Sequence, residues 1–286
     1  GHGHQEVNNA IKAQYEKISY ISSAEYFLPE SEKLAELITR KSGSKLDRVW
    51  FNGGSGSEAL EYALKTSFLY HQANGMKEKT WFISREEAYH GMTLFSNSIT
   101  NLDIYNIYKP LNPKNIGVVP QHNKYKNKYL KESDEEYVNR QVKELEDKIL
   151  EIGPEKVAGF VAETMLGQLV GNVPPCDTYW KEIRNICSKY SVHIILDEVY
   201  CGLGRSGQKH CYFWDNFSPD FVCNGKMLAA GYAPIGAMMT SSEIESKIVN
   251  EFGRILLAGT YESHPPGIAA AHAVQKICLD EKHLSH

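Results

Sequence analysis

The stretch that decides the fold is residues 223–237, which read CNGKMLAAGYAPIGA. An apolar, strand-like run precedes Lys226, and small, turn-forming residues follow it. We expect this lysine to end inside the fold, near the ends of strands, rather than in solvent. Burial would lower the pKa of its amine, and a partly neutral amine can form a Schiff base and carry protons. Taken alone, Lys226 could also be an ordinary surface lysine.

Upstream, a carboxylate also follows an apolar, strand-like run: residues 194–199 read IILDEV. Asp197 follows an apolar run, where a charge costs free energy unless it has a partner. A protonated pyridine nitrogen would be such a partner, and a cationic ring acts as an electron sink. An aspartate bonded to backbone amides explains the pattern equally well. Glu163 has the equivalent place on the preceding expected strand, where it would join the Asp197 network, lie beside a ring hydroxyl or simply open a helix.

A glycine-serine turn lies further upstream, where residues 53–59 read GGSGSEA. Glycines let the backbone approach an anion closely, and a helix starting near Ser57 would point free N–H groups and its positive dipole end at that anion. The turn therefore favours a phosphate site. Ser55 and Glu58 also fit a capping box, so a well-capped helix is the plainer alternative.

The composition excludes several classes of function. The chain has 286 residues, enough for one large α/β domain or two smaller ones, with 42% hydrophobic and 23% charged residues. A net charge of −4 gives no basic footprint for nucleic acid. No apolar run approaches the ~20 residues of a membrane helix, and we expect no signal peptide. The six cysteines show no metal-ligand spacing, so we predict reduced thiols, no metal and a cytoplasmic location.

Helical and strand patterns alternate along the chain. We predict helices over 4–19, 30–42 with Gly43 as its stop, 57–73, 134–151 and 178–190, and strands over 48–51, 80–84, 116–119, 157–162, 192–196, 221–223 and 235–240. Apart from its strand, we interpret 109–133 as a loop or insertion. Short apolar strands between helices indicate an α/β fold with a mostly parallel, mixed sheet and helices on both faces.

The candidate chemistry gathers at one edge of this expected sheet. In open α/β sheets, ligands bind outside the carboxyl ends of the strands. The side chains that follow these ends most closely are Ser57, Glu163, Asp197 and Lys226. Tyr89, in a YHG run after the strand 80–84, could stack on a flat heterocycle, although a core contact is the simpler interpretation.

With these motifs in order, the chain resembles the class III (ω-amino-acid type) aminotransferases of the fold-type-I pyridoxal phosphate enzymes, over essentially its whole length. The stretches that carry the resemblance are GHGHQEV at 1–7, SGSEA at 55–59, YHG at 89–91, DEV at 197–199, GLGRSG at 202–207, the lysine segment at 225–237, and GTY and HP at 259–261 and 264–265. Where the family usually reads E-P-[VI]-Q-G, residues 163–167 read ETMLG, so Leu166 replaces the glutamine.

The resemblance implies pyridoxal 5′-phosphate as cofactor, with Lys226 as the Schiff-base lysine and Asp197 on the ring nitrogen, both catalytic. It places Tyr89 and Val199 on the two ring faces. It also implies a homodimer with shared active sites, in which Thr260 reaches the phosphate of the other subunit. The full implied cofactor-binding set is Gly56, Ser57, Tyr89, His90, Glu163, Asp197, Val199, Lys226 and Thr260.

The resemblance implies three segments: an N-terminal helical segment over 1–45, a cofactor-binding large domain over 46–265, and the start of a helix over 266–286. That helix would link to a small domain that is absent from this chain. We therefore expect the chain to be truncated at both ends. The implied reaction moves an amino group from an amine or ω-amino acid donor to a keto-acid acceptor. An aminomutase, a decarboxylating transaminase on the same core and a non-catalytic interaction subunit stay open as alternatives.

Overall fold

The computed structural model describes residues 2–39, 45–279 and 284. Within these ranges, one seven-stranded sheet has the order β1-β7-β6-β5-β4-β2-β3. Its strands are β1 (Leu46–Asn52), β2 (Trp81–Arg85), β3 (Ile116–Val119), β4 (Val157–Glu163), β5 (His193–Asp197), β6 (Phe221–Asn224) and β7 (Gly236–Ser241). Strand β7 runs antiparallel to β1 and β6, and the other pairs along the sheet are parallel. The predicted mixed, mostly parallel sheet is therefore confirmed.

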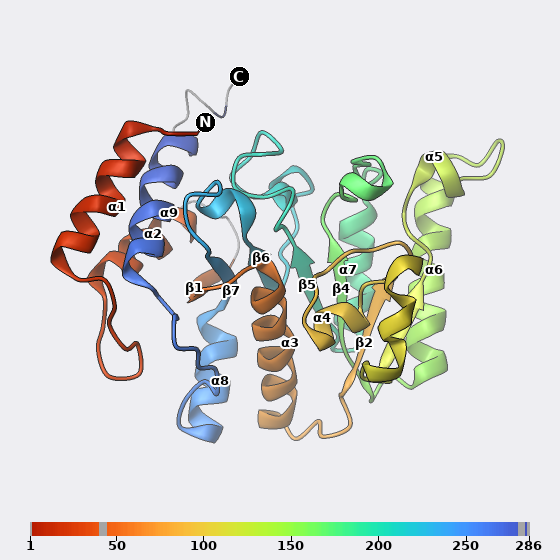
Figure 1. Cartoon of the computed structure of the whole chain (residues 1–286). Helices are drawn as coiled ribbons and strands as arrows, with labels where there is room; N and C mark the ends of the chain where they lie inside the picture. The colour runs from red at the N-terminus through yellow and green to blue at the C-terminus, as the bar shows by residue number, and fades with distance from the viewer. Residues whose placement is uncertain (1, 40–44, 280–283, 285–286) are drawn as a thin grey trace.

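Helices cover both faces of this sheet, as Figure 1 shows. Side chains of α3 (Gly56–Ala73) and α8 (Ser242–Phe252) pack in one apolar core, and those of α2 (Pro29–Thr39), α6 (Asp134–Ile152), α7 (Tyr179–Lys189) and α9 (Pro265–Cys278) pack in another. In β5, Ile195 belongs to the first core, whereas Ile194 and Leu196 belong to the second. This alternation is the period of a strand whose two faces are both buried.

The N-terminal helix α1 (Gln5–Lys17) lies against α9, far from it in sequence. Val7 of α1 packs with Ala273 and Val274 of α9. The backbone N–H of His4 also donates to the Tyr232 hydroxyl at 2.7 Å, which ties the start of α1 to the loop before β7. These contacts fix the N-terminal segment on the outer edge of the sheet.

The predicted elements agree with the structure to within a few residues, and the differences lie in several short elements and in the 11-residue α8. Segment 109–133 is not one loop, because it also holds the end of a 3₁₀ helix (Asp103–Leu111) and the single-turn α5 (Lys124–Asn127), capped by the Asn123 side chain. Helix α4 (Leu94–Ser98) and α8 were not predicted, and α9 ends at Cys278. The predicted stop at Gly43 lies outside the described residues. Further 3₁₀ turns occupy Gln168–Val170, Cys211–Trp214 and Lys226–Leu228.

No helix in the described part of the chain has the length and apolar character needed to cross a membrane.

Candidate functional site

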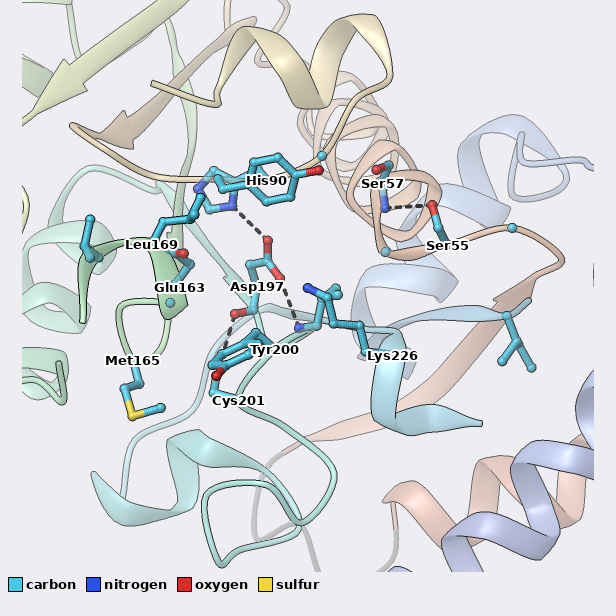
Figure 2. Close-up of a pocket in the computed structure, with 18 of the residues that line it drawn as sticks. Ser55, Ser57, His90, Glu163, Met165, Leu169, Asp197, Tyr200, Cys201 and Lys226 are labelled. Atoms are coloured by element: carbon cyan, nitrogen blue, oxygen red, sulfur yellow. Dashed lines mark hydrogen bonds and ion pairs between the residues drawn. The ribbon is translucent and has the colours of Figure 1, made fainter. Parts of the chain in front are cut away.

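A cavity of about 600 Å³ opens at the carboxyl ends of the parallel strands. Figure 2 shows the side chains that surround it, which come from the turn before α3 and from the ends of β2, β4, β5 and β6. Eight of the nine predicted cofactor-binding residues line this cavity: Gly56, Ser57, Tyr89, His90, Glu163, Asp197, Val199 and Lys226. Thr260 is exposed and is not one of the lining residues of the cavity. The structure therefore brings the predicted side chains together, apart from Thr260.

The glycine-serine turn forms one wall of the cavity. Ser55 is the N-cap of α3, and its hydroxyl accepts a hydrogen bond from the Ser57 N–H at 3.3 Å, not from Glu58 as a capping box requires. A Cβ added at Gly56 would lie 2.4 Å from Cγ2 of Val199, so a side chain at 56 would collide with the residue that faces it. The close approach of the helix start to β5 thus depends on glycine at this position.

A second turn, after β2, is fastened to the first through Ser57. The Ser57 Oγ accepts a hydrogen bond from the Met92 N–H at 3.2 Å. A Cβ on Gly91, whose φ is +129°, would come within 2.3 Å of that same oxygen. Tyr89 in this turn is partly buried, and burial raises the pKa of its hydroxyl. The two turns together hold Tyr89 beside the start of α3.

Asp197 ends β5 and is 6% exposed. Its Oδ2 lies 2.9 Å from Nδ1 of His90, and its Oδ1 accepts a hydrogen bond from the Val199 N–H at 3.0 Å. The histidine is buried too, and its backbone N–H donates to the Thr100 hydroxyl. Both partners fix the orientation of the carboxylate, and Asp197 still lines the cavity.

Glu163 ends β4 directly beside Asp197, because the two residues are paired in register. Burial raises the pKa of its carboxyl, and His90 and Arg85 oppose that rise. Its Oε2 is buried without a hydrogen-bond partner among the described residues. Glu163 therefore differs from Asp197, whose two oxygens are both bonded.

Arg85 is a charged residue that the sequence analysis missed. It ends β2, is fully buried, and donates to Nδ1 of His122 and to the backbone carbonyl oxygen of Glu163. Burial, and then the Arg85 charge, hold the pKa of His122 well below its usual range. The signal that identified Asp197, a charge directly after an apolar strand, is also present here, since residues 81–85 read WFISR.

Lys226 follows β6 and opens a 3₁₀ turn. Its φ of +33° lies in the left-handed region, a backbone conformation that costs a non-glycine residue about 1–3 kcal/mol. Its Nζ lies 5.6 Å from the centre of the Tyr200 ring, a cavity residue that the sequence analysis also missed. The expectation that Lys226 is buried is wrong, because the residue is exposed where the cavity opens.

Glu198, Cys201 and Cys211 bring three potential metal ligands within 4.8 Å of one another, next to the cavity. The carboxylate already accepts hydrogen bonds from the Thr164 hydroxyl and from the N–H groups of Cys211 and Tyr212. A hydrogen bond with Cys211, and then burial, raise the pKa of the Cys201 thiol well above its usual value. The hydrogen bonds from Cys211 and Tyr212 tie the Glu198 carboxylate to the end of the 201–212 loop.

Comparison with known proteins gives a consistent result. A family model described as "Aminotransferase class-III" matches residues 1–286. An uncharacterized aminotransferase of Schizosaccharomyces pombe is 38% identical over 99% of this chain and 62% of its own length. The gamma aminobutyrate transaminase 2 of Solanum lycopersicum is 36% identical over 90% of this chain and 56% of its own length.

Solved structures agree with the sequence matches. The ω-transaminase of Pseudomonas jessenii in complex with PMP superposes with a TM-score of 0.92 at 31% identity, covering 98% of this chain and 62% of that one. A PLP-bound amine transaminase from an uncultivated Pseudomonas species gives a TM-score of 0.93 at 30% identity, covering 99% and 64%. The chain thus spans about 60% of the length of the relatives it matches.

Proposed function

Since the chain belongs to the class-III aminotransferase family, we propose that it is the core of a transaminase that moves an amino group from an amine or ω-amino acid donor to a keto-acid acceptor. The observation that carries the proposal is the convergence of Lys226, Asp197 and the turn before α3 on one cavity. An amine, a carboxylate and an anion cradle are the groups that pyridoxal 5′-phosphate needs from a protein.

The residues of the cavity fit this cofactor. The volume of about 600 Å³ is within the range of small-molecule sites. Gly56 leaves open the space that a side chain would fill, at the start of an 18-residue helix whose first N–H groups suit a phosphate. Asp197 is buried and held by two hydrogen bonds, so it can meet a cationic ring nitrogen without reorganising.

Each of these cavity residues would have a specific role toward the cofactor. Lys226 would hold the cofactor through Nζ, and the same nitrogen would take up and return the proton that moves during transfer. Asp197 would bind the ring nitrogen, and Tyr89 and Val199 would lie on the two faces of the ring. The backbone of Gly56 and Ser57 would bind the phosphate. When bound, the cofactor supplies an aldehyde that reacts with amines and a ring that accepts electrons.

We further propose a homodimer in which Thr260 of one copy completes the phosphate site of the other. Two observations support it. Thr260 is exposed in this chain and lies outside its own cavity. Apolar side chains are also exposed on the α4 and 103–111 segments that follow the Tyr89 turn: Leu94 is 57% exposed, and Ile104 and Ile107 are each 78% exposed. Such a surface is typical of a contact with another protein.

The predicted division into 1–45, 46–265 and 266–286 and the predicted cytoplasmic location are part of the same proposal. Curated relatives include transaminases named as mitochondrial and chloroplastic, so location differs among relatives of this chain.

Product analysis tests the proposed reaction and separates it from the alternatives. The purified protein, supplied with pyridoxal phosphate, would be incubated with an amine donor, with and without pyruvate. We expect alanine only when pyruvate is present, together with the aldehyde or ketone of the donor in many turnovers; without pyruvate, the carbonyl product should stop at about one equivalent of the cofactor. A rearranged amine formed without any keto acid would indicate an aminomutase. Release of CO₂ from an amino-acid donor would indicate a decarboxylating transaminase. No product from any donor, despite bound cofactor, would favour a non-catalytic subunit.

A further inference from the structure

Only one of the two ring nitrogens of His90 has a hydrogen-bond partner among the described residues. Its Nδ1 lies 2.9 Å from Asp197 Oδ2, as the dashed line in Figure 2 marks. Its Nε2 is buried and has no hydrogen-bond partner among the described residues. A buried polar atom without a partner costs free energy, so a second partner for this ring is expected. If Nδ1–H donates to the carboxylate, a neutral ring has an acceptor at Nε2 and needs a donor there.

Glu163 is the neighbouring residue that can provide the hydrogen-bond donor that His90 Nε2 needs. The register of β4 and β5 sets Glu163 beside Asp197, the residue that His90 already contacts. Its Oε2 is the second buried atom of this group that lacks a partner within the described chain. Two unpartnered atoms, one on each neighbour of Asp197, therefore lie in one small region at the edge of the sheet.

The charges around Glu163 agree with a shared proton. The charged and titratable groups that act on its carboxyl are His90, Arg85 and Asp197. Burial raises the pKa of Glu163, which favours a carboxyl that keeps a proton and can donate it in a hydrogen bond. Arg85 is bonded to the backbone carbonyl of Glu163 rather than to its side chain, which leaves the carboxyl available.

We infer that Asp197, His90 and Glu163 form one hydrogen-bonded chain, in which a buried water joins Glu163 Oε2 to His90 Nε2 and thereby fixes the tautomer that supports Asp197. A site with polar partners on two sides can hold such a water. Glu163 is then a positioning residue that acts on Asp197 through His90. Its effect on the cofactor rests on the proposed function, whereas the hydrogen-bonded chain itself does not.

Long-range ¹H–¹⁵N NMR of the imidazole rings tests the chain directly on the cofactor-free protein, with the His90 signals assigned through His90→Gln. We expect wild-type His90 to show a proton on Nδ1 and a hydrogen-bonded Nε2. A wild-type ring whose Nε2 shows no hydrogen bond would overturn the inference without any variant.

Two substitutions at one position sharpen the result. Glu163→Gln keeps a polar side chain that can hold the water at His90 Nε2 and should preserve the wild-type pattern, whereas Glu163→Leu removes that polar group and should change the tautomer. Glu87→Leu is the matched control, because Glu87 lines the same cavity but bonds to Lys126 and Gln121. It should leave the His90 signals unchanged. Wild-type signals in Glu163→Leu would contradict the chain.

The holoenzyme gives the functional readout. Glu163→Leu should weaken binding of pyridoxal phosphate by about tenfold and lower kcat, with KM for the acceptor unchanged, and Glu163→Gln should restore both to within about threefold. A change confined to KM would instead place Glu163 on the substrate and overturn the positioning role. Absence of cofactor binding in the wild type would contradict the proposed function, while the NMR result would still decide the hydrogen-bonded chain.

Discussion

Strand β5 carries a buried polar side chain at each of its ends, His193 at its first residue and Asp197 at its last. At the amino end, His193 Nδ1 lies 2.8 Å from the Ser67 hydroxyl, and its ring stacks on His71 with the ring centres 4.4 Å apart. Nearby, the buried Lys79 donates to the carbonyl oxygens of residues 154, 157 and 190. One atom of this group, Nδ1 of His71, lacks a partner among the described residues.

The carboxyl end is built differently. His90 Nε2, Glu163 Oε2 and Arg85 Nε are all buried without a described partner, and a cavity lies next to them. Lys226 stands there on a left-handed backbone, and no cage of carbonyl oxygens from the described residues surrounds it as one surrounds Lys79. The comparison teaches that the polar groups of the amino end serve stability, whereas the carboxyl end holds Asp197 and Lys226 at a cavity that a ligand can enter.

The two lysines give the largest expected difference. Lys226→Ala should lower turnover by about a thousandfold or more, because it removes both the nucleophile and the proton carrier. Lys79→Met should leave the catalytic rate near wild type and lower the free energy of unfolding by about 1–3 kcal/mol, since three carbonyl groups lose their donor. Steady-state kinetics and urea denaturation measure the two effects. Equal turnover in Lys226→Ala and wild type would remove Lys226 from the reaction.

The next effect concerns Asp197. Asp197→Asn keeps an acceptor for the Val199 N–H but loses the charge that a ring nitrogen needs, so kcat should fall by about a hundredfold. The unfolding midpoint should shift little, because the amide fills the same space. A stability loss as large as that of Lys79→Met, with kcat unchanged, would make Asp197 a structural residue and erase the contrast between the ends of β5.

The histidines at the amino end predict a smaller, pH-dependent effect. Burial lowers the pKa of both His71 and His193 to about 3. The unfolded chain binds protons at these rings below about pH 6.5 and the folded chain does not, so stability falls as the pH drops from about 6.5 towards 3. At pH 4.5 the loss is about 3 kcal/mol per histidine.

Denaturant titrations across that pH range check this, with His193→Gln expected to reduce the slope by about half. An unchanged slope in the variant would show that other groups control stability in acid.

The smallest expected effect is at Ser57. Its hydroxyl accepts from the Met92 N–H, so Ser57→Ala loosens the turn after β2 without removing the backbone N–H groups of α3. Affinity for pyridoxal phosphate should fall by about three- to tenfold, which fluorescence titration measures. A loss above a hundredfold would mean that the hydroxyl itself, rather than the backbone, provides most of the phosphate binding.

The sequence predicted the sheet well because its strands are short apolar runs between amphipathic helices, and it predicted the site edge because Asp197 and Lys226 directly follow such runs. It did not predict α4 and α5, which are one or two turns long and too short to show a helical period. It also missed the 11-residue α8, although its buried Ile244 and Ile248 stand at helical spacing. It also placed Lys226 inside the fold, since a sequence pattern cannot show that a cavity opens beside a strand end.

Two side-chain contacts at the site also could not be predicted from the sequence. The bond between His90 and Asp197 joins residues 107 positions apart. The contact between Arg85 and Glu163 depends on β2 lying next to β4, which only the order of strands in the sheet reveals.

The central claim is that Lys226, and not the caged Lys79, is the lysine that holds the cofactor. The most direct test is to load the protein with pyridoxal phosphate, record its visible absorption, reduce it with borohydride and map the labelled peptide by mass spectrometry. We expect a visible band that borohydride bleaches and a pyridoxyl group on Lys226 alone. A label on Lys79 or another lysine, or tight cofactor binding that leaves Lys226 unlabelled, would contradict the account.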